Sequence, residues 1–233
     1  DEVIVLSRTF IEQKLQYNDG FSPVFESDGQ VLASQLDDLD GDGNWDEAVV
    51  LVNLKALQES KIKLRKIAAE RYPVFEKRTN LRLGILQEDG SYKEAEEYNA
   101  LPCSDGFEII AQAESVNWEN DKIAFRVYFD CRNVKDLFGK LKPDMIIDKI
   151  HTPEIPNYHE LADWGMDVLH CGSSLGSGGL ALMRNDSLFR LGSTDVYRYK
   201  KLVEGPVRSV FELNYAGWYV EGDNLEATEK ITI

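Results

Sequence analysis

The sequence predicts an all-β fold of antiparallel strands, arranged as a sandwich or a barrel. Short runs rich in Val, Ile, Phe and Tyr recur along the whole chain, and most are bounded by Gly, Asp, Asn or Pro. This is the pattern of strands joined by turns. Internal repeats and Pro/Ser-rich linkers are absent from the sequence, and single all-β domains often reach this size, so residues 1–233 are predicted to form one domain.

The strands are expected at residues 3–6, 47–54, 62–68, 81–87, 107–116, 123–132, 145–150, 180–184, 196–203, 207–215 and 227–233. Two segments have a composition that suits a helix. Residues 51–65 are helix-compatible throughout, and residues 133–138 are long enough for a single turn. Few short helices are therefore expected beside the sheets.

The charge balance argues against two classes of partner. The chain has 41 acidic and 26 basic residues, a formal net charge of −15, whereas nucleic acid and anionic lipid are bound by basic patches. No apolar run is long enough to span a membrane, and the chain opens on Asp1-Glu2 without a leader, as in a cytosolic or an already processed protein. Cys103, Cys131 and Cys171 have neither metal-ligand nor redox spacing, and allow at most one disulfide within the chain.

An aspartate-rich loop matches the first nine positions of a calcium-binding loop. Oxygen ligands at alternate positions are offered by Asp38, Asp40, Asp42, the Asn44 carbonyl and Asp46. Position twelve is Val49, so the bidentate glutamate of an EF-hand is missing, and a β-type run follows where a helix belongs. A structural calcium ion and a solvated turn without metal therefore both remain open.

The strand expected at 123–132 has an informative polar face. Period-two alternation places Ile123, Phe125, Val127 and Phe129 on a core face, and Ala124, Arg126, Tyr128, Asp130 and Arg132 on the other face. An aromatic ring, a guanidinium and a carboxylate on one face suit a sugar, or a uronate. The alternative, favoured when the strand is taken alone, is that Arg126 and Asp130 pair with neighbours across a solvated sheet.

Residues 158–182 combine histidines, aspartates, a tryptophan and glycines, a mixture that is costly as scaffold. His159, Asp163 and Asp167 are spaced by four, but Gly165 makes a helix doubtful, so the segment is expected to be a loop that converges on one pocket. His159 suits a general acid or base, because its ordinary pKa allows proton transfer near neutrality. Asp163 or Asp167 would orient it or act as a second carboxylate. A structural imidazole and loop-capping aspartates are the alternatives.

The remaining features of this region are expected to be structural. His151 precedes Thr-Pro in a loop, and His170 follows an apolar pair and is expected to be packed. The glycine run at 172–179 lacks the Gly-Lys-Ser/Thr ending of a phosphate loop. Its glycines are expected to permit tight turns and a close approach of the backbone to a ligand or a neighbouring strand.

Long motifs in this chain resemble those of a known family. They are the Trp-Glu-Asn-Asp run at 118–121, the Arg-Val-Tyr-Phe-Asp-Cys-Arg-Asn run at 126–133, the Asp-Leu-Phe-Gly-Lys run at 136–140, Tyr158-His159, and the Asp-Trp-Gly-Met-Asp run at 163–167 with the glycine string to Leu182. The acidic stretch at 35–47, Tyr72-Pro73 and the Gly-Pro-Val-Arg run at 205–208 add to the likeness. Together they resemble the bacterial family of unknown function DUF4861, over most of the chain.

This resemblance implies a fold, a location and a function. It implies a large antiparallel β-sandwich (a supersandwich) like that of galactose mutarotase, and a protein exported by glycan-degrading bacteria. Family members are usually longer, so a C-terminal portion is expected to be missing here. The implied partner is an oligosaccharide or polysaccharide, often one that contains uronic acids. Sandwich folds host many unrelated functions, so the implication is one of analogy.

The same resemblance gives directions to individual side chains. Arg126 and Lys140 are expected to hold an anionic group, with Tyr128, Asp130 and Trp164 beside the sugar. The reaction stays open between a lyase, a glycoside hydrolase and an epimerase-like step. The alternatives are a non-catalytic carbohydrate-binding protein, with Trp118, Tyr128 and Trp164 as stacking platforms, and a calcium-stabilised accessory domain. Structural calcium is the only cofactor expected.

Overall fold

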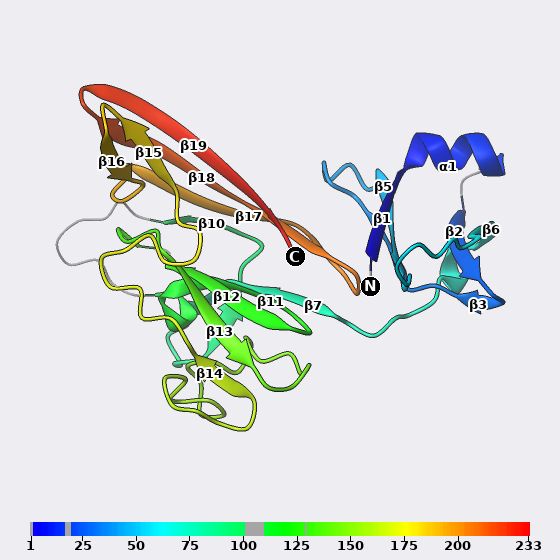
Figure 1. The fold of residues 1–233 in the computed structure, drawn as a ribbon, viewed down its shortest axis with the longest axis horizontal. Helices are drawn as coiled ribbons and strands as arrows, with labels where there is room; N and C mark the ends of the chain where they lie inside the picture. The colour runs from blue at the N-terminus through cyan, green and yellow to red at the C-terminus, as the bar shows by residue number, and fades with distance from the viewer. Residues whose placement is uncertain (1, 17–19, 101–109, 129) are drawn as a thin grey trace. The chain divides into compact units, whose positions relative to one another are not determined.

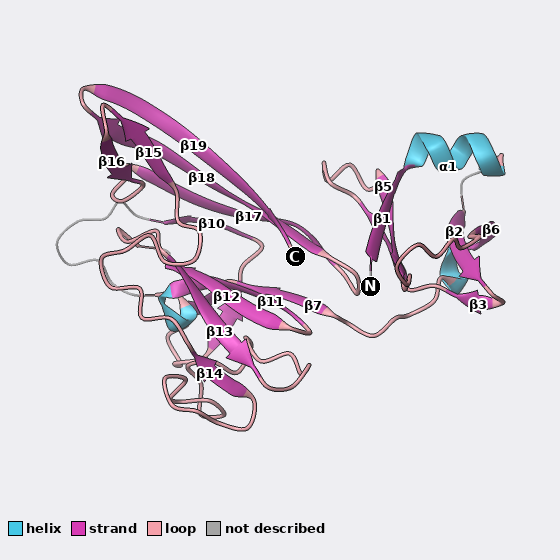
Figure 2. Ribbon diagram, in the orientation of Figure 1, coloured by secondary structure: helices cyan, strands magenta, loops and turns pink. Residues whose placement is uncertain are grey.

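The computed structural model describes residues 2–16, 20–100, 110–128 and 130–233. Half of the protein is β-strand and 6% is helix, so the predicted all-β, antiparallel, sandwich-like architecture is confirmed (Figure 2). The single domain expected from the sequence divides into two compact units. The first unit is Asp1–Arg78 with Leu202–Ser209, and the second is Thr79–Lys201 with Val210–Ile233.

The first unit consists of two three-stranded sheets and one helix (Figure 1). One sheet has the order β1-β5-β4, formed by Glu2–Ser7, Glu47–Val52 and Ser34–Asp37; the other has the order β3-β2-β6, formed by Gln30–Val31, Phe21–Ser27 and Lys63–Ala68. Helix α1 (Arg8–Leu15) begins after Ser7, whose Oγ accepts a hydrogen bond from the Phe10 amide. Ile11 of α1 is fully buried against Phe25 and Val50 of the sheets. A short 3₁₀ turn, η1 (Ala69–Arg71), follows β6.

The second unit is built on two larger antiparallel sheets (Figure 1). The five-stranded sheet has the order β14-β13-β12-β11-β7, formed by Gly165–Asp167, Lys135–Lys140, Ile123–Tyr128, Ser115–Asn120 and Thr79–Arg82. The four-stranded sheet has the order β10-β17-β18-β19, formed by Glu97–Ala100, Val196–Glu204, Ser209–Val220 and Asp223–Thr232. Two small hairpins, β8 (Gly84–Leu86) with β9 (Tyr92–Glu94) and β15 (Ala181–Arg184) with β16 (Ser187–Arg190), and the 3₁₀ turn η2 (Gln112–Glu114) complete the unit.

The core between these two sheets is formed by alternate residues of their strands. Trp118 of β11 stacks on Phe125 of β12, with ring centroids 5.6 Å apart, and contacts Phe211 of β18 at 5.3 Å. Val127 of β12 and Leu213 of β18 belong to the same buried cluster. The predicted core face of β12 is therefore packed against the second sheet, as in a β-sandwich.

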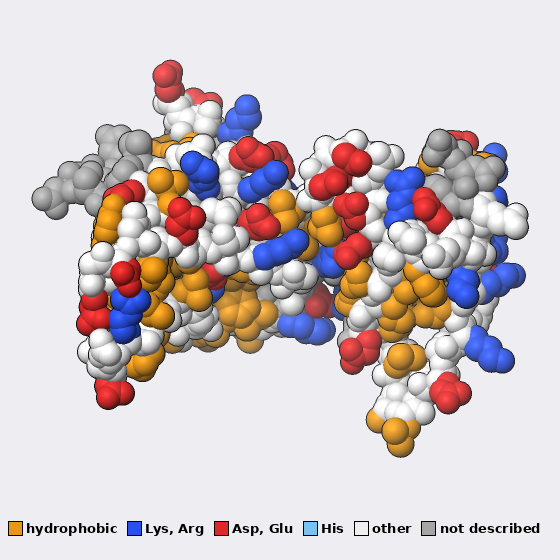
Figure 3. Space-filling view, turned by 90° about the horizontal axis from the view of Figure 1, so that it is seen from above, with side chains coloured by type: hydrophobic (Ala, Val, Ile, Leu, Met, Phe, Trp, Pro, Cys, Tyr) orange, Lys and Arg blue, Asp and Glu red, His pale blue; other side chains and the backbone are white. Residues whose placement is uncertain are grey.

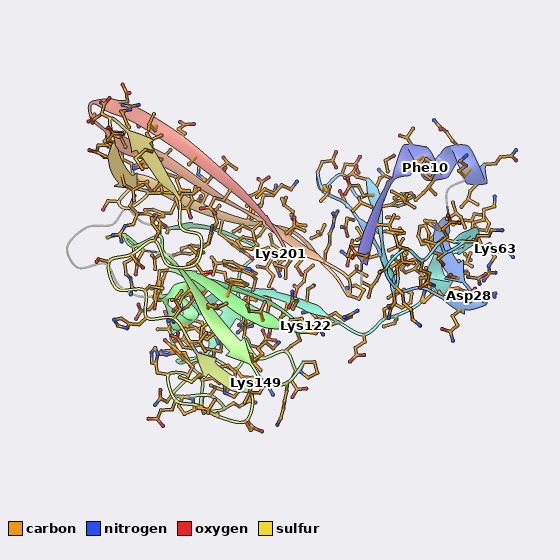
Figure 4. The ribbon with its side chains drawn as sticks, viewed as in Figure 1. Phe10, Asp28, Lys63, Lys122, Lys149 and Lys201 are labelled. Atoms are coloured by element: carbon orange, nitrogen blue, oxygen red, sulfur yellow. The ribbon has the colours of Figure 1, made fainter. Side chains whose placement is uncertain are left out.

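The opposite face of the five-stranded sheet is also covered, by the segment of residues 141–164. Ile147 and Trp164 of this segment pack on Ala124 and Phe138 of the sheet. Lys149, in the same segment, and Lys122, at the turn between β11 and β12, are labelled in Figure 4. The expected polar face of β12 is therefore not a solvated surface.

A buried carboxylate fastens the covering segment to the sheet. Glu119 of β11 is fully buried, and its Oε1 accepts hydrogen bonds from the amides of Ile146 and Ile147 at 2.7 and 2.9 Å. Its Oε2 accepts from Lys140 Nζ at 2.7 Å, and Asn80 Nδ2 also donates to Oε1, at 3.4 Å. Glu119 thereby provides hydrogen-bond acceptors for two backbone amides and an ammonium group that are shielded from water.

Several local expectations are wrong because tertiary pairing overrides composition. Within residues 133–138, expected to form a turn, residues 135–138 belong to β13, which gains a ladder with β12. Residues 51–65 are not helical, and residues 145–150 form turns whose isoleucines face the sheet. The run at 81–87 is split between β7 and β8. Helix α1 was not expected, although Ser7 offers a helix cap and Arg8 pairs with Glu12 at 2.7 Å one turn later.

Two expectations concern residues outside the described part of the chain. They are the first part of the strand expected at 107–116 and the core position of Phe129. Among the described residues, the helices lack the length and the apolar character needed to cross a bilayer.

Candidate functional site

A pocket of about 420 Å³ is lined by residues of β12, β13, β14 and the segment that follows β14. The polar side chains on its wall are those of Tyr128, Arg132, Asp136, His159, Asp167 and His170. All of them belong to the second unit. Three strands therefore contribute to one concave site of the size that holds a small ligand.

Arg126 is the centre of the ionic network behind this pocket. In the sheet register it lies opposite Asp136, and it donates to Asp136 Oδ2 from Nε at 2.8 Å and from Nη2 at 2.5 Å. Nη2 also donates to Asp167 Oδ2 at 3.0 Å, and Nη1 donates to the Tyr158 hydroxyl at 3.0 Å. Only 1% of the Arg126 side chain is exposed. Its donors are directed to protein groups, so Arg126 orients its neighbours instead of meeting a ligand.

His159 and Asp167 form a pair on the pocket wall. Nδ1 of His159 lies 3.2 Å from Oδ2 of Asp167, whose other oxygen accepts from the Leu169 amide at 3.1 Å. The His159 side chain is 64% exposed, whereas that of Asp167 is 7% exposed. This approach of Nδ1 to the carboxylate favours the tautomer that carries its proton on Nδ1, which leaves the Nε2 lone pair as the proton acceptor.

The surroundings of Asp167 change its acidity. Burial raises the pKa of this carboxyl above its ordinary value of 3.8, and the nearby Asp136 adds to the effect, although the Leu169 amide, Arg126 and His159 oppose it. Asp167 is therefore protonated at a higher pH than an exposed aspartate. Once protonated, it no longer stabilises an imidazolium at His159.

Tyr128 and Arg132 form a second group at the pocket. The guanidinium carbon of Arg132 lies 3.7 Å from the centroid of the Tyr128 ring, and that of Arg126 lies 4.4 Å from it. Both contacts are cation–π interactions. The Tyr128 ring is thus engaged by two guanidinium groups, and its predicted role as a platform for a sugar is not supported by this arrangement.

The other predicted residues do not line this pocket. Asp163 is 82% exposed and pairs with Lys142 at 2.6 Å, so Asp167, and not Asp163, reaches His159. Lys140 is 1% exposed and pairs with Glu119, and Trp164 is 7% exposed within the core beneath residues 141–164. Asp130 lies in the turn after β12, where it binds Arg132. Burial therefore removes Lys140 and Trp164 from the predicted binding set.

Sequence reasoning missed three members of the site. Asp136 was hidden because residues 133–138 were expected to form a turn; a hairpin between β12 and β13 places it directly opposite Arg126. Tyr158 was named only as part of a motif, and its ring packs against that of His159 with centroids 4.4 Å apart. His170, expected to be packed, is exposed and lines the pocket.

The cysteines have separate roles. Burial raises the pKa of the Cys171 thiol to about 11, and Sγ lies 3.4 Å from the Lys135 carbonyl oxygen. Cys171 is therefore protonated at neutral pH and is unsuited to nucleophilic catalysis. Cys131 is disulfide-bonded, and Cys103 lies outside the described residues.

Two glycines let the segment after residue 164 approach β13 closely. Gly165 has a φ of 136°, and a Cβ there would lie 1.8 Å from the Gly139 carbonyl oxygen. Gly176 has a φ of 61°, and a Cβ there would lie 2.0 Å from the Lys135 carbonyl oxygen. The prediction that the glycines of residues 172–179 permit close approach to a neighbouring strand is confirmed at Gly176, and the structure adds Gly165 as a second such position.

The aspartate-rich loop connects β4 to β5 in the first unit. Carboxylate oxygens of Asp38, Asp40 and Asp42 all lie within 4.8 Å of one another. Asp38 accepts from the amides of Gly41 and Gly43, while Asp46 accepts from the Leu39 amide at 2.7 Å. Asn44 donates its amide to Asp42. Val49 is fully buried, so the twelfth position of the loop offers no ligand.

Comparison with known proteins places this architecture in a family. The model of the family described as "Domain of unknown function (DUF4861)" matches residues 1–233. The chain is also 26% identical, over 220 residues, to "Uncharacterized protein P7" of Formosa agariphila, covering 87% of this chain and 49% of the relative. The chain thus spans about half the length of this curated relative. No solved structure matches. The match over all 233 residues shows that the chain belongs to the DUF4861 family.

Proposed function

We propose that this protein acts on acidic, uronic-acid-containing oligosaccharides by general acid–base chemistry, with His159 as the group that moves the proton. The observation that carries the proposal is the pair of His159 Nδ1 and Asp167 Oδ2, 3.2 Å apart on the wall of a pocket of about 420 Å³. An exposed imidazole held by a buried carboxylate is a common arrangement for a catalytic base.

In this proposal the carboxylate determines what the imidazole does. The Asp167 carboxylate lies beside Nδ1 and favours the proton there, so Nε2 takes a proton from the substrate, and the imidazolium that forms is stabilised by the adjacent negative charge. Arg126 and Asp136 are positioning residues. Arg126 is held by two hydrogen bonds to Asp136, and its remaining Nη2–H fixes Asp167.

The geometry favours abstraction of a carbon-bound proton over hydrolysis. A glycoside hydrolase of the usual kind needs two carboxyl groups that flank the scissile bond. Asp136 and Asp167 are 1% and 7% exposed, and both bind Arg126, which leaves neither available as a second acid. Removal of the proton next to a uronate carboxylate needs one base. Elimination then breaks the bond to the neighbouring glycosidic oxygen, which takes up a proton from the imidazolium, whereas inversion requires a proton from water on the opposite face of the carbon.

Two further observations support the proposed export of the protein and the proposed class of partner. A disulfide at Cys131 is favoured outside the reducing cytosol, in agreement with an exported protein. On the face shown in Figure 3, acidic and basic side chains are interspersed, without the continuous basic stripe that nucleic-acid binding favours. We therefore propose a glycan, not a nucleic acid, as the partner.

The proposal predicts turnover of an acidic oligosaccharide. The protein, in its full-length form, is to be incubated with a panel of uronic-acid-containing oligosaccharides and with their carboxyl-reduced counterparts. Mass spectrometry of the products is expected to show chain cleavage without uptake of water for a lyase, and NMR is expected to show an inverted carbon for an epimerase-like step. If the panel is left unchanged, or if products gain one water, the proposed proton abstraction is wrong, and a non-catalytic carbohydrate-binding function becomes the better interpretation.

We also propose that the loop of Asp38, Asp40 and Asp42 binds a structural calcium ion, because three carboxylates lie within reach of one cation. Calcium that binds only the folded protein is expected to raise the melting temperature, and a chelator to lower it. Asp40→Asn should remove this response. Asp28→Asn, at an exposed turn of the same unit (Figure 4), should preserve it. A melting temperature that is indifferent to both calcium and chelator contradicts the calcium site.

A further inference from the structure

Arg132 is the arginine that the pocket exposes to solvent. Its side chain lines the pocket and is 40% exposed. In contrast, Arg126 and Lys140 are each 1% exposed, in buried ion pairs. The cationic group that can meet an incoming anion in this pocket is therefore a residue outside the set predicted to hold one.

The guanidinium of Arg132 is held in a fixed plane. Its Nε donates to both oxygens of Asp130, at 2.8 and 3.0 Å, and its Nη2 contacts Asp130 and Glu114. The Tyr128 ring supports it at 3.7 Å. Within the described part of the chain these hydrogen bonds use Nε and Nη2, so the two N–H groups of Nη1 can be offered to a ligand. A planar, pre-oriented guanidinium loses little entropy when it binds a carboxylate.

We propose that Arg132 is the specificity-determining residue of the pocket and that it binds the carboxylate of a uronic-acid residue. This rests on the proposed function, because it places the carboxylate of the sugar in the same pocket as the His159 base. Tyr128 then acts as the support of the guanidinium, and not as the surface on which a sugar ring stacks.

The charges around Arg132 determine what kind of selectivity to expect. Asp130 and Glu114 offset the charge of the guanidinium, and the chain as a whole carries a net charge of −15. Long-range attraction of an anion is therefore weak. Preference for an acid must come from direct, charge-assisted hydrogen bonds, which discriminate between a carboxylate and its neutral ester by about tenfold to a hundredfold.

The test compares binding of matched acidic and neutral probes. Disaccharides that end in glucuronate, galacturonate or mannuronate, and the carboxyl methyl ester of each, are titrated into the protein, and affinity is followed by ligand-observed NMR. We expect at least one acid to bind more tightly than its ester, and Arg132→Gln to reduce that ratio by about tenfold or more. Arg132→Lys, which keeps the charge but loses the planar fork, should retain part of the preference.

Arg184→Gln is the matched control. Arg184 also lies between two carboxylates, with Asp223 at 2.7 Å and Glu221 at 4.0 Å, but it is not part of the pocket wall. Its replacement should leave the ratio of acid to ester affinity unchanged. Thermal unfolding of both variants checks that they fold.

Three outcomes overturn the inference: an unchanged ratio in a folded Arg132→Gln protein, the same loss in Arg184→Gln, and no preference for any acid over its ester in the unmodified protein. The third outcome includes the case in which neither the acid nor the ester of any pair binds. These outcomes are distinguishable from failure of the proposed function, because binding ratios do not depend on turnover. If His159→Asn retained full turnover, the role of the base would fail, while the role of Arg132 would still stand on its binding ratio.

Discussion

Replacement of His159 by asparagine is expected to lower kcat on an acidic oligosaccharide by about 10²- to 10⁴-fold, the usual contribution of a general acid or base. Asparagine keeps a polar amide at this position, but it cannot take up a proton. Binding should persist, because the anion contact proposed for Arg132 is made by another side chain. The measurement is a comparison of kcat, KM and thermal stability for the variant and the unmodified protein.

His151→Asn provides the matched change for this prediction. His151 is exposed, and its ring lies 6.4 Å from those of Tyr92 and Tyr158, but it does not line the pocket. The His151→Asn substitution should therefore leave kcat nearly unchanged. Full activity of His159→Asn, or an equal loss in both variants, would show that His159 is not the base.

The roles proposed for His159 and Asp167 also predict how kcat/KM falls at low pH. Because burial raises the pKa of Asp167, this carboxylate gains its proton above the ordinary value of 3.8 as the pH falls, and the loss of its charge beside the base should steepen the acid limb of kcat/KM. The dependence of folding stability on pH has the opposite sign to that of a paired surface aspartate. Because the pKa of Asp167 is raised in the folded protein, protonation of this carboxyl as the pH falls stabilises the folded state relative to the unfolded state. Asp163→Asn should leave the profile unchanged, because Asp163 pairs with Lys142 at the surface.

Glu119→Gln is expected to lower the free energy of unfolding of the second unit by about 3–5 kcal/mol, the typical result of breaking a buried ion pair. The variant leaves the Lys140 ammonium buried at 1% exposure without its carboxylate. It also weakens the acceptor for the amides of Ile146 and Ile147, which fasten residues 141–164 over the sheet. Denaturant unfolding at 25 °C measures the change.

The exposed pair of Lys142 and Asp163 serves as the control, and Asp163→Asn should give no measurable loss of stability. In a second comparison, the double variant Glu119→Gln with Lys140→Met should recover much of the loss, because it removes the unpaired buried charge. A Glu119→Gln protein as stable as the parent would mean that the pair does not hold the covering segment. Loss of that segment should also weaken the site, since it carries Tyr158 and His159.

The sequence by itself determined the features that depend on local periodicity and residue type. Alternation along residues 123–128 predicted both faces of β12, because side chains point to opposite sides of a strand with period two. The glycine run at 172–179 predicted close backbone approach, which the missing Cβ of Gly176 allows. The motifs of the chain indicated its family, and the matching family model confirms it. The proposed activity, the location and the calcium site stay predictions.

Only the tertiary structure decided which polar groups face the pocket. The register of β12 with β13 pairs Arg126 with Asp136, and residues 141–164 cover the sheet, so Lys140 and Trp164 become buried and cannot reach a ligand. The pairing of β14 with β13 places Asp167 beside Arg126 and within reach of His159, whereas Asp163 remains in the preceding loop. Burial and partner choice depend on contacts between residues distant in the sequence, which a local pattern does not encode.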